Sequence, residues 1–157
     1  MSRFRLSGLD HRQFQSLFAL DDAGLAARGA IRCIADSAPG YPCRISLDDA
    51  VIGETLLLLP YLHQPASSPY RSSGPIYVRH AATQPVLAPG EVPPYVTRRL
   101  ISLRAYDHRD MMVAADVHEG TEVRDALEQL FARAEVAYVH LHNARQGCFS
   151  CLASRVG

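Results

Sequence analysis

The residues best suited to chemistry lie near the C-terminus, where Cys148-Phe-Ser-Cys151 follows closely after His140-Leu-His142. Cysteine and histidine are the usual zinc ligands, and a histidine beside a cysteine can activate it as a nucleophile. In an extended strand, the two histidines share one face, whereas cysteines three residues apart point to opposite faces. The spacing therefore argues against one site formed by all four side chains.

Regular strand pairing would still bring three of these side chains together. Suppose that Val139 and Leu141, which alternate with the histidines, face the core. The returning strand then places Phe149 and Cys151 beside them and leaves Cys148 on the other face with His140 and His142. This trio could ligate a metal, or His142 could act as the base for a Cys148 nucleophile. The alternative is a solvated or hydrogen-bonded histidine face and a half-buried Cys148 that packs as a small hydrophobe. We predict catalytic roles for Cys148 and His142, and no metal.

A second thiol lies in Pro39-Gly-Tyr-Pro-Cys-Arg44, where Cys43 has a cation as its direct neighbour. A neighbouring guanidinium favours the thiolate, which is the reactive form of cysteine. Cys43 is therefore a further candidate nucleophile. The alternative is a structural role, because the two prolines already account for the segment as a fixed turn.

Arginine is concentrated in the middle of the chain. Residues 55–104 hold a single acid, Glu91, against five arginines, which are Arg71, Arg79, Arg98, Arg99 and Arg104. A guanidinium binds a carboxylate or phosphate through two parallel hydrogen bonds. If Arg79 and Arg104 project from one sheet face together with Arg44, they predict a pocket for a small anion. The alternative is that each arginine pairs with an acid from outside the segment and has no functional role.

Composition excludes several classes of function. The 157 residues include 16 basic and 16 acidic side chains, and this balance is not typical of a protein that binds nucleic acid. Every basic residue is arginine, so a P-loop lysine, a pyridoxal Schiff base and a lysine nucleophile are all excluded. No G-x-G, G-x-S-x-G or His-Glu-x-x-His motif is present. We predict no cofactor and no nucleic-acid partner.

The chain shows no export signal or membrane span. The N-terminal residues contain arginines without a following apolar stretch, and the longest apolar run, residues 56–62, is far shorter than the ~20 residues of a transmembrane helix. We therefore expect a cytoplasmic protein with no membrane partner. In that compartment the four cysteines, Cys33, Cys43, Cys148 and Cys151, are expected to be reduced.

The elements that must position these residues are mostly strands. Residues 1–157 are expected to form a single domain. The prolines all fall between residues 39 and 94, so the middle of the chain is expected to be rich in loops. A first strand is predicted around Phe4, Leu6 and Leu9, and further strands are predicted over residues 30–36, 54–62 and 75–80. Pro60 is expected to weaken the C-terminal end of the strand over 54–62.

Two hairpins and a helix are predicted in the second half. Residues 100–107 and 111–117 form one hairpin, and residues 136–142 and 148–153 form the other. Between them, residues 121–133 have the apolar spacing of an amphipathic helix. Two short helical segments, from Asp10 to Leu20 and over 21–28, are expected near the N-terminus. The predicted class is α+β, with a largely antiparallel sheet and the longer helix before a C-terminal β-hairpin.

Five separated blocks of the sequence have a motif-like character, namely PGYPCR (39–44), LDDAVIGETLLLL (47–59), PYRSSGPIYVR (69–79), RAYD (104–107) and HLHNARQGCF (140–149). Together and in this order, they resemble a bacterial family, the domain of unknown function numbered 1203. The resemblance implies a stand-alone cytoplasmic domain and brings no reaction, substrate or cofactor. It adds Tyr70, Asp107 and Asn143 to the candidate ligand-binding residues, because they lie in these blocks.

The sequence thus predicts a domain that binds a small anionic ligand through Arg44, Arg79 and Arg104. If it is catalytic, Cys43 or Cys148 is the nucleophile and His142 the base; the sequence does not decide whether it is an enzyme. The alternative function is a non-catalytic interaction domain, in which a sheet edge or the Met111-Met112 hairpin binds a partner or forms a homodimer.

Overall fold

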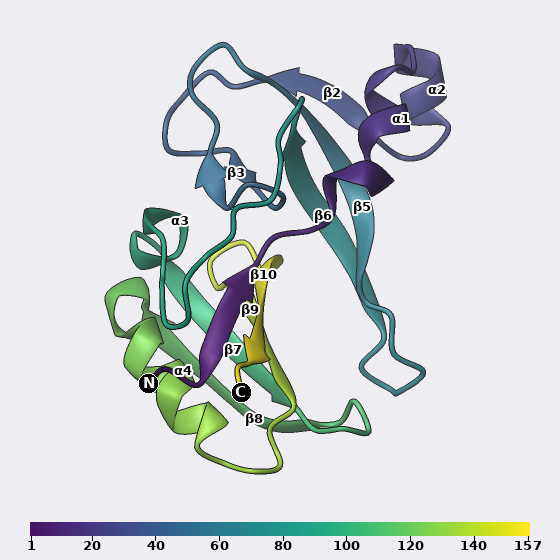
Figure 1. Cartoon of the computed structure of the whole chain (residues 1–157). Helices are drawn as coiled ribbons and strands as arrows, with labels where there is room; N and C mark the ends of the chain where they lie inside the picture. Colours follow the sequence, from purple (N-terminus) through teal and green to yellow (C-terminus); the bar gives the residue numbers. More distant parts are fainter.

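The strands are divided between two sheets in the computed structural model, which describes residues 1–157 (Figure 1). The first sheet contains, in spatial order, β1 (Phe4–Ser7), β10 (Cys148–Arg155), β9 (Tyr138–Asn143), β7 (Leu100–Tyr106) and β8 (Met112–Glu119). The second contains β2 (Ile31–Ile34), β5 (Thr55–Gln64), β6 (Ser72–Arg79), β3 (Pro42–Cys43) and β4 (Asp48–Asp49). The helices are α1 (Gln15–Phe18), α2 (Asp22–Ala26), α3 (Pro94–Thr97) and α4 (Val123–Phe131), with 3-10 turns η1 (His11–Gln13) and η2 (Gly120–Glu122).

The first sheet is antiparallel throughout, and both predicted hairpins are confirmed as β7–β8 and β9–β10. The predicted helix is confirmed as α4, although its first turn is the 3-10 turn η2. Its buried residues, which include Val123, Leu127 and Phe131, pack with Leu103 and Leu141 of the sheet in the largest core cluster. Apolar side chains of β7 and β9 therefore face α4, and the alternate residues face the other way.

The second sheet is antiparallel except for the short parallel contact between β3 and β6. The expectation that Pro60 weakens its strand is wrong, because β5 continues through that residue to Gln64. Pro60 lies opposite Pro75 of β6, and β2 reaches only as far as Leu58 along the other side of β5. No neighbour therefore needs an N–H from residue 60.

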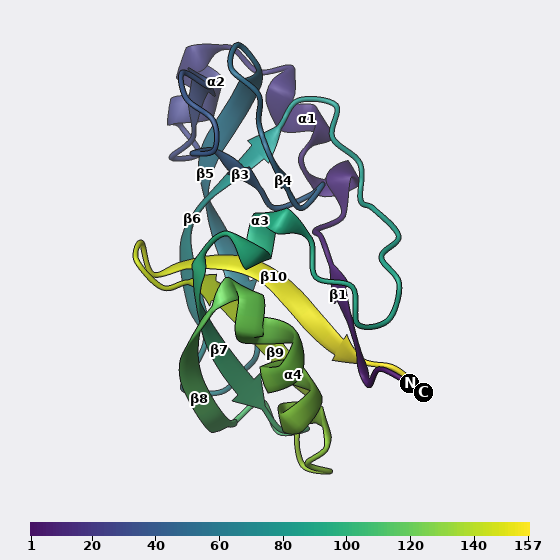
Figure 2. The same ribbon diagram turned by 90° about the vertical axis from the view of Figure 1, so that its left-hand side faces the viewer.

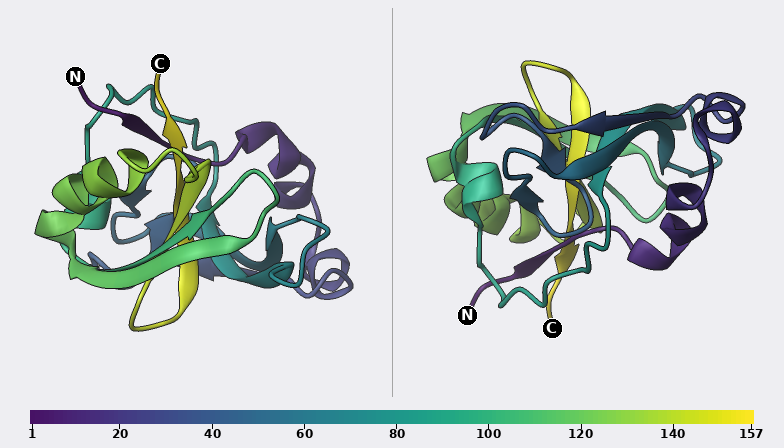
Figure 3. Two further views of the ribbon diagram at one scale, coloured as in Figure 1. Left: turned by 90° about the horizontal axis from the view of Figure 1, so that it is seen from below. Right: turned by 90° about the horizontal axis from the view of Figure 1, so that it is seen from above.

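The N-terminal helices are shorter than predicted. The Asp10 side chain accepts a hydrogen bond from Arg12 N, not from a capping-box partner, and α1 ends at Phe18. Asp21 caps α2 by accepting from Gly24 N at 2.8 Å, as its position before the helix indicates. In Figure 3, α1 and α2 lie at the opposite side of the molecule from α4.

The α+β class with largely antiparallel pairing is confirmed, and the finding not foreseen is the division into two sheets. Gly8 lies where the chain passes from the first sheet to the second, and a Cβ there would be 1.9 Å from the carbonyl oxygen of Ile45. The next residue, Leu9, donates from its backbone N to the carbonyl of Arg44 at 2.9 Å. This close crossing fixes Arg44 between the sheets.

The chain ends lie side by side, since Val156 N donates to the carbonyl of Arg3 at 2.8 Å (Figure 2). All four cysteines are free thiols. No helix combines the length and the hydropathy that a transmembrane span requires.

Candidate functional site

A cavity of about 390 Å³ lies where the two sheets meet the β9–β10 turn. Three arginines line it, and no carboxylate does. The polar side chains of its lining include Arg44, Arg98, Arg99, Asn143, Gln146 and Cys148. The cavity therefore has the size of a small-molecule site and a positively charged wall.

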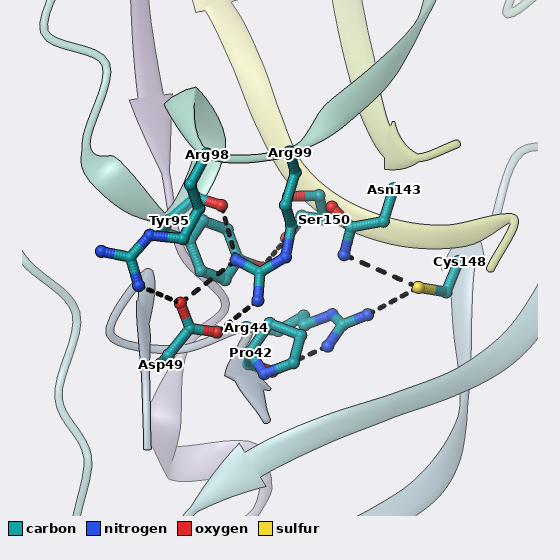
Figure 4. A network of polar contacts seen from close by, with 9 residues as sticks. All are labelled: Pro42, Arg44, Asp49, Tyr95, Arg98, Arg99, Asn143, Cys148 and Ser150. Carbon is teal, nitrogen blue, oxygen red and sulfur yellow. Dashed lines mark hydrogen bonds and ion pairs between the residues drawn. The ribbon is translucent and has the colours of Figure 1, made fainter. Parts of the chain in front are cut away.

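Arg44 is the most deeply buried of these residues, with 2% of its surface exposed. Its Nε donates to the carbonyl of Phe149 at 2.7 Å, and its Nη1 donates to the carbonyl of Pro42 at 2.7 Å. Its Nη2 donates to Cys148 Sγ at 3.0 Å (Figure 4). No carboxylate lies within 4.0 Å of this guanidinium. A buried arginine is normally paired with an acid, so Arg44 has an unmatched charge.

A β-bulge at Ser150 creates the wall that holds Arg44. Along β10, Phe149 pairs with His142 and Cys151 pairs with Leu141, so Ser150 is an extra residue. A bulge leaves backbone groups outside the regular ladder. Two of them are bound by side chains: Phe149 O accepts from Arg44, and Ser150 O accepts from the Tyr95 hydroxyl at 2.9 Å. The bulge therefore provides the two carbonyl groups that accept hydrogen bonds from Arg44 and Tyr95.

Cys148 is half-buried and receives two donors at its sulfur. Besides Arg44, the Nδ2 of Asn143 lies 3.7 Å from Cys148 Sγ (Figure 4). The Oδ1 of Asn143 is buried and has no hydrogen-bond partner. Burial raises the pKa of Cys33, and it raises the pKa of Cys151 to about 12, which keeps both as neutral thiols.

Arg98 and Arg99 follow α3 and share one acid. Asp49, whose side chain is 6% exposed, accepts from Arg98 Nη1 at 3.0 Å and from Arg99 Nη1 at 3.2 Å. Two guanidinium groups therefore face one carboxylate. Gly120 allows this arrangement, because a Cβ there would lie 2.2 Å from the carbonyl of Val96 in α3. Together with Arg44, the arginines give the cavity a net positive charge.

The predicted pocket formed by Arg44, Arg79 and Arg104 is not observed. Arg79 pairs with Glu54 at 2.7 Å and with Asp48 at 3.2 Å, as the alternative interpretation expected. Arg104 lies on β7 opposite His140 and lines neither this cavity nor that of Arg79. Of the three, Arg44 alone lines the cavity, since Arg79 is bound by Glu54 and Asp48, and Arg104 lies beside His140 on the first sheet.

The predicted trio of His140, His142 and Cys148 is wrong in its geometry. Cys148 pairs with Asn143 and therefore lies on the face opposite to His142. The Ser150 bulge is the cause, since it places Phe149 on the histidine face and leaves Cys151 beside Leu141. The prediction that the two histidines share a face is consistent with their positions on β9. The hydrogen-bond partners of the Cys148 sulfur are Arg44 and Asn143, and neither is a general base.

The remaining candidates are dispersed. Cys43 is buried, and its sulfur accepts from Arg79 N at 3.3 Å, away from the cavity. Tyr70 packs edge-on against Tyr106 with ring centroids 5.9 Å apart. Asp107 accepts from the backbone N of Met111 at 3.0 Å, and this hydrogen bond lowers the pKa of its carboxyl. Asn143 is the ligand-binding candidate that lies in the cavity with Arg44.

Sequence reasoning missed Arg98 and Arg99 as site residues. The excess of arginine over acid in residues 55–104 included them, but their position beside Arg44 depends on α3. That helix is four residues long and has no periodic pattern in the sequence. The Pro93-Pro94 pair at its start was the available signal.

The fold and the cavity define an α+β protein with an arginine-lined hollow shared by its two sheets. The family model described as "Protein of unknown function (DUF1203)" matches residues 40–155, and the chain belongs to this family. The resemblance found in the sequence is thereby confirmed. A search of the curated proteins and a search of the solved structures each gave no match.

Proposed function

We propose that this protein binds a small anionic molecule in the cavity lined by Arg44, Arg98 and Arg99. The observation that carries the proposal is the buried Arg44, which has no carboxylate partner and lines a cavity without acidic residues. Asp49 offsets one of the other two charges from outside that lining. The cavity thus has an excess of positive charge that an anionic ligand would neutralise.

The polar groups of the cavity indicate what the ligand carries. Arg99 binds Asp49 through both of its Nη groups, whereas Arg98 binds it through Nη1. The other donors of the Arg98 guanidinium suit a carboxylate or a phosphate group. The buried, unpartnered Oδ1 of Asn143 can accept a hydrogen bond, so the ligand is expected to have an N–H or O–H group as well. A volume of about 390 Å³ limits it to a small molecule.

The Cys148 thiol lies on the wall of this cavity and would touch the ligand. Arg44 Nη2 and Asn143 Nδ2 both lie within hydrogen-bonding distance of its sulfur, so the side chain is held at the cavity wall by two donors. Cysteine is an intrinsically strong nucleophile. Cys148 therefore remains our candidate nucleophile, without His142 as its base.

The charge of the cavity can be tested through the chemistry of Cys148. Iodoacetate and iodoacetamide alkylate the same thiol, but the first is an anion and the second is neutral. At ~6 Å and an effective dielectric of about 20, one guanidinium attracts an anion by about 3 kcal/mol before screening. We expect the ratio of iodoacetate to iodoacetamide rates at Cys148 to exceed that of free cysteine by about tenfold, which corresponds to about 1.4 kcal/mol.

The rates are measured by mass spectrometry of the separate cysteine peptides, with the half-buried Cys33 outside the cavity as the internal control. R98Q should lower the ratio at Cys148, whereas R109Q, on the exposed β7–β8 turn, should not change it. Inorganic phosphate should slow both reagents. A ratio equal to that of free cysteine, unchanged in R98Q, would refute the proposal.

A second candidate function is self-association through β2, an edge strand of the second sheet. Ile31 and Ile34 of this strand are 61% and 63% exposed. An exposed apolar edge can pair with the same edge of a second copy. Sedimentation velocity should then show a dimer whose population rises with concentration and falls in I31K; a monomer at all concentrations would reject this candidate.

A further inference from the structure

Three histidines lie together between the two sheets, on the opposite face of β9 from Asn143. His63 comes from β5, and His140 and His142 come from β9. The ring centroid of His63 lies 5.1 Å from that of His142 and 6.2 Å from that of His140. Phe149 stacks on His63 with centroids 5.5 Å apart. We call His63, His140 and His142 the histidine cluster.

The histidine cluster contains most of the buried side-chain polar atoms that have no hydrogen-bond partner. Five buried side-chain nitrogen or oxygen atoms have no hydrogen-bond partner, and four of them belong to these three imidazoles. His140 is 6% exposed and His142 is 1% exposed. A buried polar atom without a partner is destabilising, because it has lost its hydrogen bonds to water and gained none in return. An arrangement that concentrates this cost in one place is typical of a ligand site.

Arg104 adds an unmatched positive charge. It pairs across the strands with His140, so both side chains lie on the same face of the first sheet. Its hydrogen bond is to Ser102 Oγ at 3.4 Å, and no carboxylate lies within 4.0 Å of its guanidinium. A fixed cation beside three imidazoles opposes the binding of a metal ion and favours an anion.

A cavity of about 540 Å³ gives access to the histidine cluster, and His63 and His140 form part of its wall. Its other polar lining groups include Gln64, Tyr138 and Asp110. Asp110 is the one carboxylate among the lining residues, and its Oδ1 accepts from the Tyr138 hydroxyl at 2.6 Å. Tyr106 packs against His140 with centroids 5.2 Å apart.

We propose that the histidine cluster and Arg104 form a second anion site, which takes the carboxylate or phosphate group of a small molecule. An oxyanion accepts hydrogen bonds from the imidazole N–H groups of His63 and His140 at the cavity wall. It is also attracted by the charge of Arg104, which lies beside His140 on the same face of the sheet. The site lies on the other face of β9 from Cys148 and is independent of the function proposed above.

Binding at this site takes up protons. Burial and the neighbouring positive charges hold the pKa of His140 at about 4 and that of His142 at about 3, and they lower the pKa of His63. An anion among the rings favours their protonated forms, as the Asp110 carboxylate already does weakly for His140. Affinity is therefore expected to rise by about tenfold for each proton taken up per unit fall in pH.

The test is a titration of inorganic phosphate followed by the imidazole NMR signals at about pH 7 and about pH 6. Saturable shifts of His63 and His140, with tighter binding at the lower pH, are expected. A parallel titration with succinate distinguishes the two sources of the oxyanion: the ligand that produces the shifts identifies the group. No saturable shift with either probe would overturn the proposal.

Two variants separate this site from the arginine-lined cavity. R104Q should abolish the histidine shifts and leave the alkylation ratio at Cys148 unchanged. R98Q should lower the alkylation ratio at Cys148 and leave the histidine shifts unchanged. If R104Q does not fold, R104K retains the charge and should bind, and the response of the unmodified protein still decides the question. Histidine shifts that persist in folded R104Q would contradict the proposal.

Discussion

Mild acid should destabilise this protein through His140 and His142. Both imidazoles are buried with unpartnered nitrogens, and burial holds their pKa values at about 4 and about 3. In the unfolded chain each would titrate near 6.5. Because the pKa of each histidine is lower in the folded state, the unfolded state binds more protons at pH values between the folded and the unfolded pKa. The stability is therefore fully present above about pH 6.5 and is lost as the pH falls toward the folded values.

The size of the effect follows from the two pKa differences. Between about pH 7 and about pH 5, the unfolded state gains nearly one proton per histidine while the folded state gains almost none. The free energy of unfolding should fall by about 2 kcal/mol for each histidine, or about 4 kcal/mol for the pair. For a domain of this length, that loss lowers the Tm by about 10 °C.

The assay is thermal unfolding followed by circular dichroism in phosphate-free buffers across this pH range. Carboxyl groups whose pKa is lowered, such as those of Glu54 and Asp107, change the stability mainly below about pH 5. Between about pH 7 and about pH 5, the change in stability is therefore due mainly to the histidines. H142F removes one titrating group from a site beside Phe149 and should reduce the loss of stability between about pH 7 and about pH 5 by about 2 kcal/mol. H108Q, at an exposed turn position, is the matched control and should leave it unchanged.

The outcome that refutes this reasoning is a Tm that stays constant from about pH 7 to about pH 5. A fall of equal size in the H142F variant would refute the assignment to His142. Addition of phosphate should reduce the loss at the lower pH if the second anion site exists, because a ligand that binds the folded state stabilises it.

Two further predictions concern the arginine-lined cavity. D49N removes the acid shared by Arg98 and Arg99, so the iodoacetate preference at Cys148 should rise about threefold or more while the Tm falls, since breaking a buried pair is destabilising. G120A places a Cβ against the carbonyl of Val96, and this overpacking should cost about 1–3 kcal/mol in chemical denaturation. A G120A protein of unchanged stability would contradict the close packing of α3.

Local patterns predicted the fold where they were long and regular. The apolar face of α4 and the turn residues of the two hairpins identified elements that the structure confirms. The short elements α3, β3 and β4 have two to four residues, which is too few for a periodic signal. They form because long-range contacts stabilise them, as the ion pairs from Asp49 to Arg98 and Arg99 show.

For the candidate site, the sequence indicated the kinds of side chain better than it indicated which residues lie together. Residue types predicted arginines, a thiol and an anion, and Arg44, Asn143 and Cys148 were among the candidates. The fold shows that these three residues line one cavity, which their spacing in the sequence did not indicate. The histidine pairing failed at Ser150, because a one-residue bulge reverses the alternation of side chains and has no signature in Phe-Ser-Cys. His63 was missed because it lies just beyond residue 62, where the predicted strand ended, whereas β5 continues to Gln64.

Ser150 is important because it is an additional residue in β10 that forms the bulge, and its hydroxyl group contributes little. The hydroxyl contacts Cys151 Sγ at 3.9 Å, so alanine should be tolerated there. A chain one residue shorter between Asn143 and Cys151 would pair regularly, and its carbonyls would return to the ladder instead of binding Arg44 and Tyr95. The length of this interval should therefore distinguish family members that keep the cavity from those that have lost it.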